Sequence, residues 1–465
     1  MSAPVLWIIF PSLAGIIIWF FRKNRNATFL GAISISGILS IVAALFPIEK
    51  LISFSFFSAN LSSSFTLLGR SLVLVDAERS FLILAYTMLT IWLVIAWLGR
   101  TRRIFASVSM IFVALLIAAI AVQPFFYSAL IIEVAVLLSI LILFRPGQKS
   151  AKGILRYLIF QTLAVPCILM IGWLTEVAGT NPTDTSLVNL MVLLTGLGFA
   201  FWLAIFPFYS WLPMLSEESD PVEGGFILGM MPTFILFLLL NFIDGFIWLR
   251  DLTFVFTIYR IACIIMVATG GIWAAFQIKL SRLFGYAVIM ETGFALIGLS
   301  LRNQTGLQFF TLGMFPRMIA FAIWSYTISR VSNQNLDVSL KGVRGLFRKA
   351  PWISMGLFIS MASLAGIPLF AAFPFRLVLI QALLQQGGSI VIWIFIGILG
   401  FLIATFRFAA RIFQKPDEAG RPWEGRYSSM MLAIAMVILL LIGIFPNFFL
   451  AGTNHLLEAF QYLNW

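Results

Sequence analysis

The stretch GFAFWLAIFPFYSWLP, residues 198–213, is a long apolar segment with prolines in its middle. A second stretch, SLAGIPLFAAFPFRLVLI at residues 363–380, has the same character, and both contain the tripeptide Phe-Pro-Phe. A proline inside a helix removes a backbone hydrogen bond and frees a carbonyl group. Inside a membrane such groups are tolerated only where protein or a water-lined cavity surrounds them. The stretches therefore predict two broken membrane-spanning helices at a site between two related halves, with prolines Pro207, Pro213, Pro368 and Pro374.

The remainder of the chain is composed almost entirely of long apolar segments. Of its 465 residues 61% are hydrophobic and 10% are charged, and the mean hydropathy is +1.04. Continuous apolar runs of this length predict transmembrane helices, whereas a membrane β-barrel would show short alternating segments. We expect an all-α membrane protein, with loops too short to be domains, the longest at about 48–79 and 330–350. About fourteen predicted helices lie near residues 4–21, 28–47, 80–98, 104–121, 124–144, 153–174, 187–212, 222–243, 253–275, 283–301, 306–329, 351–384, 389–410 and 428–450.

The basic residues are distributed unevenly among the loops. If the N-terminus lies outside, the inside loops hold most of the 30 lysines and arginines. This asymmetry predicts that both termini lie on the outer side of the membrane. It also explains the net charge of +12 without a nucleic-acid partner. One inside loop is instead acidic, Met214-Leu-Ser-Glu-Glu-Ser-Asp-Pro-Val-Glu223, and we expect it to be solvated or to contact another subunit.

Five ionisable residues fall well inside the predicted helices, away from their ends. Because a charge in hydrocarbon is expensive, each is a candidate for the path of a transported proton. Glu133 is either such a group or a neutral structural carboxylate, and Glu291 either titrates or is a static partner of an arginine. We expect Glu291 to pair with Arg317 or Arg260, although Arg260 could instead extend to the outer surface. The five candidates are Glu133, Arg260, Glu291, Arg317 and Arg376.

Several other kinds of site are not predicted. The two cysteines, Cys167 and Cys263, lie in apolar segments, and the single histidine, His455, cannot build a haem or zinc site. The sequence has no phosphate-binding glycine loop outside the membrane and no nucleophile–base pair. We therefore expect no catalytic residue, no metal and no cofactor bound by this chain.

Five segments in order resemble one known family. GFAFWLAIFPFYSWLP resembles the helix-7 signature of the antiporter-like membrane subunits of respiratory complex I, with matches at Phe208, Trp211, Leu212 and Pro213. The family also includes subunits of multicomponent sodium/proton antiporters and of membrane-bound hydrogenases. Each motif alone is weak, but the collinear order is specific over about residues 80–415. The other four matching segments are 123–138, 151–165, 280–299 and 345–377.

The resemblance implies a fold of two inverted five-helix repeats in which the seventh and twelfth helices are broken. On this basis we expect N-terminal helices at 1–98, a first repeat at 99–245, a second repeat at 246–415 and a C-terminal helix within 416–465. It also implies a bacterial plasma-membrane protein that moves protons or sodium within a larger assembly. Its partners would be other membrane-arm subunits and the lipid bilayer.

The sequence departs from the family at positions that normally carry a charge. The family's lysine and histidine on helix 7 align with Trp202 and Tyr209, and its helix-8 lysine aligns with Thr233. Two positions usually held by lysine carry Arg317 and Arg376. Arg317 follows Pro316, which we count with the prolines expected to break a helix. Arginine keeps its proton because its pKa is above about 12, and is therefore a poor proton carrier. Glu133 does match the family's helix-5 glutamate.

Three functions are compatible with this pattern. The first is a membrane-arm subunit of a complex I-like NADH:quinone oxidoreductase, or of a related redox-driven complex, which contributes to proton translocation while partner chains carry the redox chemistry. The second is a subunit of a multicomponent cation/proton antiporter, although the lost lysines disfavour it. The third is a degenerate scaffold that conducts nothing. A mixed version has a conducting second half and an inert first half.

Overall fold

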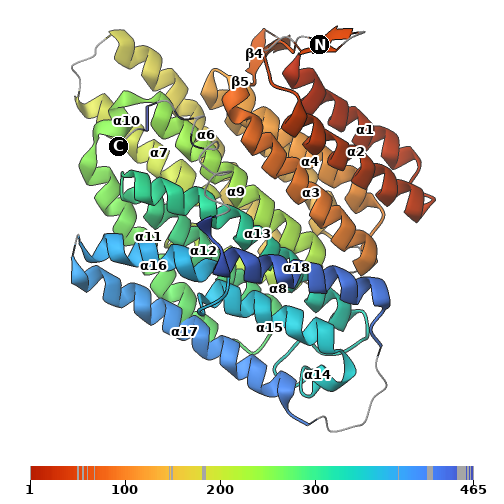
Figure 1. The fold of residues 1–465 in the computed structure, drawn as a ribbon. Helices are drawn as coiled ribbons and strands as arrows, with labels where there is room; N and C mark the ends of the chain where they lie inside the picture. Colours follow the sequence, from red (N-terminus) through yellow and green to blue (C-terminus); the bar gives the residue numbers. More distant parts are fainter. Residues whose placement is uncertain are drawn as a thin grey trace.

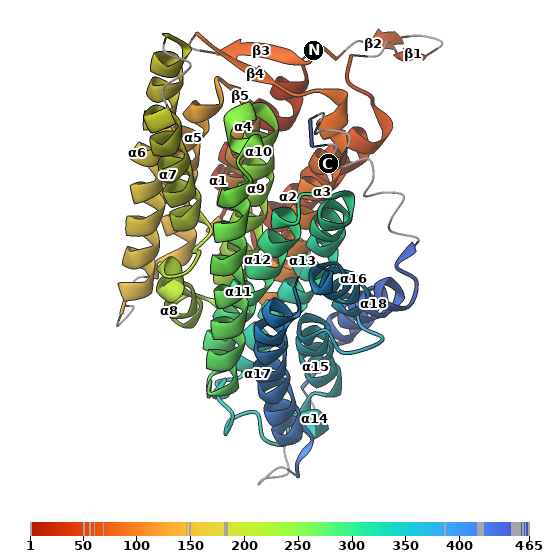
Figure 2. The same cartoon turned by 90° about the vertical axis from the view of Figure 1, so that its left-hand side faces the viewer.

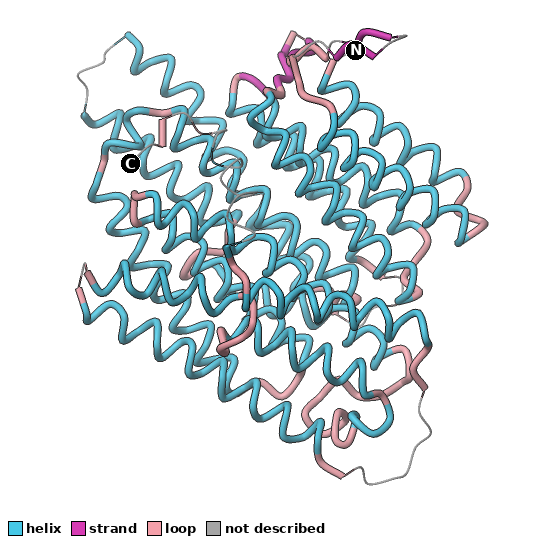
Figure 3. Tube along the Cα trace, viewed as in Figure 1, coloured by secondary structure: helices cyan, strands magenta, loops and turns pink. Residues whose placement is uncertain are grey.

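The computed structural model describes residues 2–463 except 50–51, 55–56, 60, 68, 146, 148–149, 181–184, 386, 416–422, 448–456, 458–459 and 461. His455 and the start of the predicted C-terminal unit lie outside the described residues. Helices make up most of the described chain (Figures 1 and 3). They are η1 Val5–Ile9, α1 Phe10–Phe20, α2 Arg25–Leu45, η2 Asp76–Glu78, α3 Arg79–Gly99, α4 Ile104–Ala121, η3 Phe125–Tyr127, α5 Ser128–Leu143, α6 Lys152–Thr180, α7 Thr185–Trp202, η4 Phe208–Ser210, α8 Trp211–Glu218, α9 Pro221–Gly245, α10 Ile247–Asp251, α11 Thr253–Ala275, α12 Leu280–Ser300, α13 Gln304–Ser332, α14 Leu346–Lys349, α15 Pro351–Ala365, α16 Ala372–Leu384, α17 Gly388–Phe413 and α18 Arg426–Ile444.

The prediction of an all-helical membrane fold is confirmed. Within the described residues, 11 helices are long and apolar enough to cross a membrane, and shorter apolar helices accompany them. Each predicted segment overlaps one helix or several successive ones: 187–212 covers α7, η4 and the start of α8, and 351–384 covers α15 and α16. The chain is thus an integral, multi-pass membrane protein, and fourteen crossings stay a prediction.

Several helix starts follow from local capping. Before α2, the Asn24 side chain accepts hydrogen bonds from the backbone of Asn26 and Ala27, at 3.1 and 3.3 Å. Asp220 and Asn303 cap α9 and α13 in the same way. Such caps satisfy backbone N–H groups that have no partner within the helix. Each of these helices therefore begins where a capping side chain precedes an apolar run.

The long helices run roughly side by side, and α9, α12 and α13 lie at the centre (Figures 1 and 2). We call α4–α9 the first half and α11–α17 the second half. In the first half α4 packs on α5 and α9, and in the second half α11 packs on α12 and α17. Buried residues make up 94% of the most apolar window of α9 and 100% of that of α12. The contact between the halves therefore lies in the protein interior, away from lipid.

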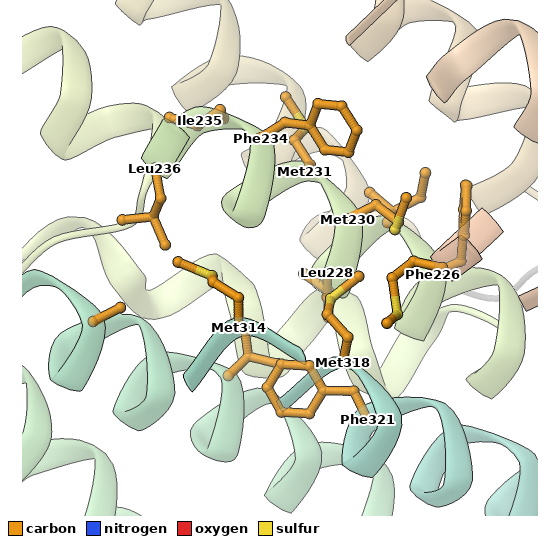
Figure 4. Packing of buried hydrophobic residues seen from close by; sticks show 14 of the residues in the cluster. Phe226, Leu228, Met230, Met231, Phe234, Ile235, Leu236, Met314, Met318 and Phe321 are labelled. Atoms are coloured by element: carbon orange, nitrogen blue, oxygen red, sulfur yellow. The ribbon is translucent and has the colours of Figure 1, made fainter. Parts of the chain in front are cut away.

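Methionine and phenylalanine side chains fill the contact between α9 and α13. Met314, Met318 and Phe321 of α13 face Leu228 and its neighbours on α9 (Figure 4). All of these side chains are buried. Methionine is flexible enough to fill irregular gaps between helices. This apolar contact surrounds the few polar groups described below.

Short strands occur where the sequence predicted only a loop at 48–79. β1 Ile52–Phe54 pairs with β2 Phe57–Ala59, and β3 Ser64–Leu67, β4 Arg70–Val73 and β5 Val122–Gln123 form a second antiparallel sheet. The strands lie at the end of the molecule that holds the N-terminus, and α14 lies at the opposite end (Figure 2). Strands of two to four residues are too short to show a clear alternating pattern, so the sequence did not reveal them.

Candidate functional site

The predicted break in the second half is present between α15 and α16. α15 ends at Ala365, and Gly366 follows with a φ of 72°. This left-handed conformation suits glycine, which has no Cβ atom. Pro368 lies in the connecting turn, and Pro374 lies in the first turn of α16. The break leaves carbonyl groups at the end of α15 that need partners from outside that helix.

Arg376 of α16 supplies one such partner and also forms a buried ion pair. Its Nη2 atom donates to the carbonyl of Leu364, in the last turn of α15, and to the carboxylate of Glu291 on α12. Its guanidinium carbon lies 4.3 Å from the centre of the Phe294 ring. Arg376 is 4% exposed and Glu291 is 8% exposed. A cation at a helix C-terminus is attracted to the negative end of the helix dipole. Arg376 therefore both stabilises the end of α15 and neutralises the Glu291 carboxylate.

Gly366 provides the space that Arg376 occupies. A Cβ atom built on Gly366 would lie 2.9 Å from Nη1 of Arg376 and 3.0 Å from its Cδ. Such a contact is shorter than real Cβ atoms allow, so a larger residue would displace the guanidinium group. The turn conformation and the position of the cation therefore depend on the same glycine.

Arg317 is a second buried cation beside this pair. It follows Pro316 within α13, is 5% exposed, and donates from Nη2 to the hydroxyl of Thr233 on α9 at 2.6 Å. Glu291, Arg317 and Arg376 line one cavity at the break together with Pro316, Ser363 and Phe375. The cavity has space for about one or two water molecules. The structure thus unites two cations and one carboxylate around space for water.

The expected partners of Glu291 were wrong. Its ion pair is with Arg376, 85 positions further along the chain. Arg317 lines the same cavity but directs Nη2 to Thr233. Sequence proximity favoured Arg317 and Arg260, but the packing of α16 against α13 brings the more distant residue to the acid.

Arg260 lies outside this cavity. From α11 it donates to the Ser300 hydroxyl at 3.1 Å and to the Ser300 carbonyl at 2.6 Å. Ser300 is the last residue of α12, so Arg260 caps the C-terminus of that helix. The structure therefore gives Arg260 a capping role and does not bring it to the other candidates.

The break in the first half is held by neutral groups. α7 ends at Trp202, and the chain continues through Pro207 and Tyr209 to α8, where Pro213 is the third residue. The amide of Gln161 on α6 donates to the carbonyl of Trp202 at 3.2 Å, and both residues are 1% exposed. Trp202, which the sequence aligned with the family's lysine, has a neutral indole side chain, and a neutral amide binds its freed carbonyl.

Glu133 occupies a different environment from Glu291. It is half-buried on α5 and accepts a hydrogen bond from Thr162 of α6 at 2.8 Å. Its Oε2 atom is buried and, in the described part of the chain, has no hydrogen-bond partner. The neighbouring Leu130 and Val134 are 46% and 53% exposed. Glu133 therefore lies at the edge of an outward-facing apolar surface.

The acidic segment is more ordered than expected. Glu223 is fully buried, and Arg102 donates to its two carboxylate oxygens at 2.9 and 2.8 Å. Asp220 forms an ion pair with Arg145. Lys279, immediately before α12, binds Glu217 at 2.7 Å. The prediction of a solvated loop was therefore wrong for Glu223, because Arg102, in the connection between α3 and α4, neutralises its charge inside the protein.

Sequence reasoning missed several residues that organise the two breaks. Gln161 and Thr162 are polar residues within an apolar helix, and nothing in the local sequence shows which carbonyl or acid they meet. Gly366, by contrast, was detectable, since glycine just beyond a helix with proline two positions later is a typical helix end. Ser363 was hidden because serine is common on buried helix faces.

Sequence comparison relates this chain to proteins from several bacteria. The NADH-quinone oxidoreductase subunit N of Acinetobacter baumannii (strain AB0057) is 24% identical, over 96% of this chain and 93% of the relative. The NADH-quinone oxidoreductase subunit N of Ectopseudomonas mendocina (strain ymp) is 28% identical, over 56% of this chain and 54% of the relative.

Solved structures share the fold over nearly the whole chain. A chain of the archaeal membrane-bound sulfane sulfur reductase has a TM-score of 0.82 at 15% identity and covers 100% of this chain and 98% of that one. A chain of the Mrp complex from Dietzia sp. DQ12-45-1b has a TM-score of 0.80 at 17% identity, with coverage of 100% and 99%. For respiratory complex I from Thermus thermophilus with bound NADH, the TM-score is 0.77 at 16% identity, with coverage of 99% and 100%.

A family model matches the segment that contains both helix breaks and all five ionisable candidates. The match extends over residues 121–403, more than half of the chain. It begins just before α5, which carries Glu133, and ends within α17, beyond Arg376. By this match the chain belongs to the NADH:quinone oxidoreductase/Mrp antiporter transmembrane family.

Proposed function

We propose that this chain is a membrane-arm subunit of a complex I-like NADH:quinone oxidoreductase and contributes to proton translocation. The names of the bacterial relatives support the redox-driven assembly. The redox cofactors would lie in partner chains, and this chain would be a non-redox part of the translocating enzyme. Its neighbours would be other membrane-arm subunits.

The observation that carries the proposal is the buried pair of Glu291 and Arg376 at the α15–α16 break. The two arginines at the cavity keep their protons, so Glu291 is the group there that can exchange one. When Glu291 is ionised, Arg376 holds it. When Glu291 takes up a proton, its attraction to Arg376 weakens, and water in the cavity can receive or deliver the proton. The arginines then set the charge of the site while the carboxylate titrates.

The second half would therefore conduct protons, and the role of the first half would be mainly structural. At the α7–α8 break the described contacts involve Gln161 and the Trp202 backbone, neither of which titrates. Glu133 lies at the surface of that half and would act only by exchanging a proton with a group outside it. The units proposed from the sequence, 1–98, 99–245, 246–415 and 416–465, place one break in each repeat.

The cellular setting is also a proposal. The relatives come from bacteria, which supports a bacterial plasma membrane. Arg100 and Arg103 lie in the connection between α3 and α4, and Arg348 lies in α14, which is at the end of the molecule opposite the strands (Figure 2). By the positive-inside rule we infer that this end lies in the cytoplasm and that both termini lie outside.

Proton pumping tests the proposal most directly. Inverted membrane vesicles containing the intact complex would carry Glu291→Gln or, as the matched variant in the first half, Glu133→Gln. NADH oxidation and the fluorescence of a pH-sensitive dye would be recorded together. We expect Glu291→Gln to lose most of the pumping per NADH, because glutamine cannot exchange the proton. Normal pumping with Glu291→Gln in a fully assembled complex would refute conduction through this site.

A specific observation keeps the multicomponent antiporter as a second candidate. The Mrp chain matches this fold as well as the complex I chain does. Purification of the tagged chain in mild detergent, followed by mass spectrometry, separates the two. Iron–sulfur and flavin subunits are expected for the redox complex. Recovery of small membrane subunits alone would favour the antiporter, and recovery of the folded chain by itself would contradict both assemblies.

A further inference from the structure

We propose that the cavity at the α15–α16 break binds one small monovalent inorganic anion, such as chloride, between Arg317 and Arg376. The described side chains lining this cavity include two arginines and one carboxylate, Glu291. The ion pair with Glu291 neutralises one guanidinium group and leaves the second charge without a counter-ion in that lining. An uncompensated charge in a protein interior is strongly unfavourable.

The donor groups at the cavity also need an acceptor. Nε of Arg317 and Nη1 of Arg376 are buried and have no hydrogen-bond partner among the described residues. The Nη2 atoms of both side chains already donate to protein groups. A buried N–H group without an acceptor costs about 1–3 kcal/mol. A water molecule would satisfy these donors but leave the excess charge, whereas an anion answers both needs.

The size and walls of the cavity restrict the occupant. The space admits about one or two water molecules, which suits a halide and excludes a lipid phosphate or an organic acid. The walls include Phe309 and Phe375, and an apolar surrounding strengthens the attraction between an anion and the arginines. Ser363 also lines the cavity and offers a hydroxyl donor. This inference rests on charge and space alone and does not require proton translocation.

Bromide identifies the site directly, since it replaces chloride and scatters X-rays anomalously. Crystals of the full chain in its native assembly would be soaked in sodium bromide, with sodium gluconate as the control. We expect one anomalous peak within hydrogen-bond distance of Arg317 Nε and Arg376 Nη1. A cavity with no peak, filled by ordered water under both conditions, would overturn the proposal.

A melting experiment tests the same site in solution. Replacing gluconate by chloride at constant ionic strength is expected to raise the melting temperature of the wild-type chain by about 1–2 °C, because the ion binds only the folded state. Arg317→Gln should abolish this chloride-dependent rise. Arg260→Gln, an arginine outside the cavity, should retain it. A wild type that is insensitive to chloride, or an Arg317→Gln variant with the full rise, would contradict the proposal even if pumping were normal.

Discussion

The two helix breaks in this protein meet the same problem with different chemistry. In each half the first part of a broken helix ends inside the protein and leaves a carbonyl group in need of a donor. In the first half the carbonyl of Trp202 receives the neutral amide of Gln161. In the second half the carbonyl of Leu364 receives the guanidinium group of Arg376. Both groups donate a hydrogen bond to the carbonyl, but the guanidinium group also carries a positive charge.

The positive charge of Arg376 explains why the break in the second half also contains a carboxylate. A buried cation needs a carboxylate, and Glu291 provides it. The corresponding acid of the first half, Glu133, accepts a hydrogen bond from the neutral hydroxyl of Thr162 and lies at the edge of an exposed surface. Of the two breaks, the one held by a charged donor is therefore also the one with a buried ion pair. The comparison teaches that a helix break can be held by a neutral donor or by a charged one.

Removal of the buried carboxylate should have the largest effect on stability. Glu291→Gln leaves both cavity arginines without a carboxylate, and loss of one partner of a buried ion pair typically costs about 3–5 kcal/mol. We expect a strongly lowered melting temperature of the purified complex. The double variant Glu291→Gln with Arg376→Gln should recover part of the loss, because it removes one of the uncompensated cations. An unchanged melting temperature for Glu291→Gln would show that the buried carboxylate does not stabilise the second break, and the contrast with the first break would fail.

A substitution at the turn should have the next largest effect. Gly366→Ala forces a side chain into a left-handed conformation and toward Arg376. Strain of this kind costs about 1–3 kcal/mol, which thermal melting would detect. Gly313→Ala is the matched control, since its Cβ would meet nothing within 4 Å. If both variants melt alike, the position of Arg376 does not depend on the space at Gly366.

Loss of the neutral donor should have a smaller but measurable effect. Gln161→Leu leaves the buried Trp202 carbonyl without the side-chain donor and should cost about 1–3 kcal/mol, toward the lower end because no charge is involved. Gln277 donates to the Trp273 carbonyl at 2.8 Å at the partly exposed end of α11. Gln277→Leu should therefore change the melting temperature little, because water replaces the lost donor. Equal effects of the two substitutions would argue that Gln161 does not hold the first break.

The smallest effect is expected for Glu133→Gln. The amide oxygen of glutamine can still accept the hydrogen bond from Thr162, and no described cation loses its partner. We expect a change in unfolding free energy below about 1 kcal/mol, measured by melting in parallel with Glu291→Gln. A loss as large as that of Glu291→Gln would mean that Glu133 has a charged partner in the assembled complex, and the contrast between the halves would then fail.

Hydropathy alone predicted much of this protein. The apolar segments and the positions of both breaks follow from composition and proline placement, because a bilayer admits long apolar helices and exposes any interruption. The five ionisable candidates were also recognisable as exceptions within apolar runs. Neutral partners such as Gln161 and Thr162 were not, since their importance depends on which group each one contacts.

Only tertiary packing decided how these groups combine. Glu291 meets Arg376 across 85 positions, while Arg260, nearer in sequence, caps α12 instead. Which face of a helix meets which neighbour depends on the rotation and depth of each helix in the bundle. In helices buried on all sides, such as α9 and α12, apolar residues surround the whole circumference and give no periodic signal for that rotation. The ionisable residues of the site are therefore evident from the sequence, and their pairing is a property of the folded chain.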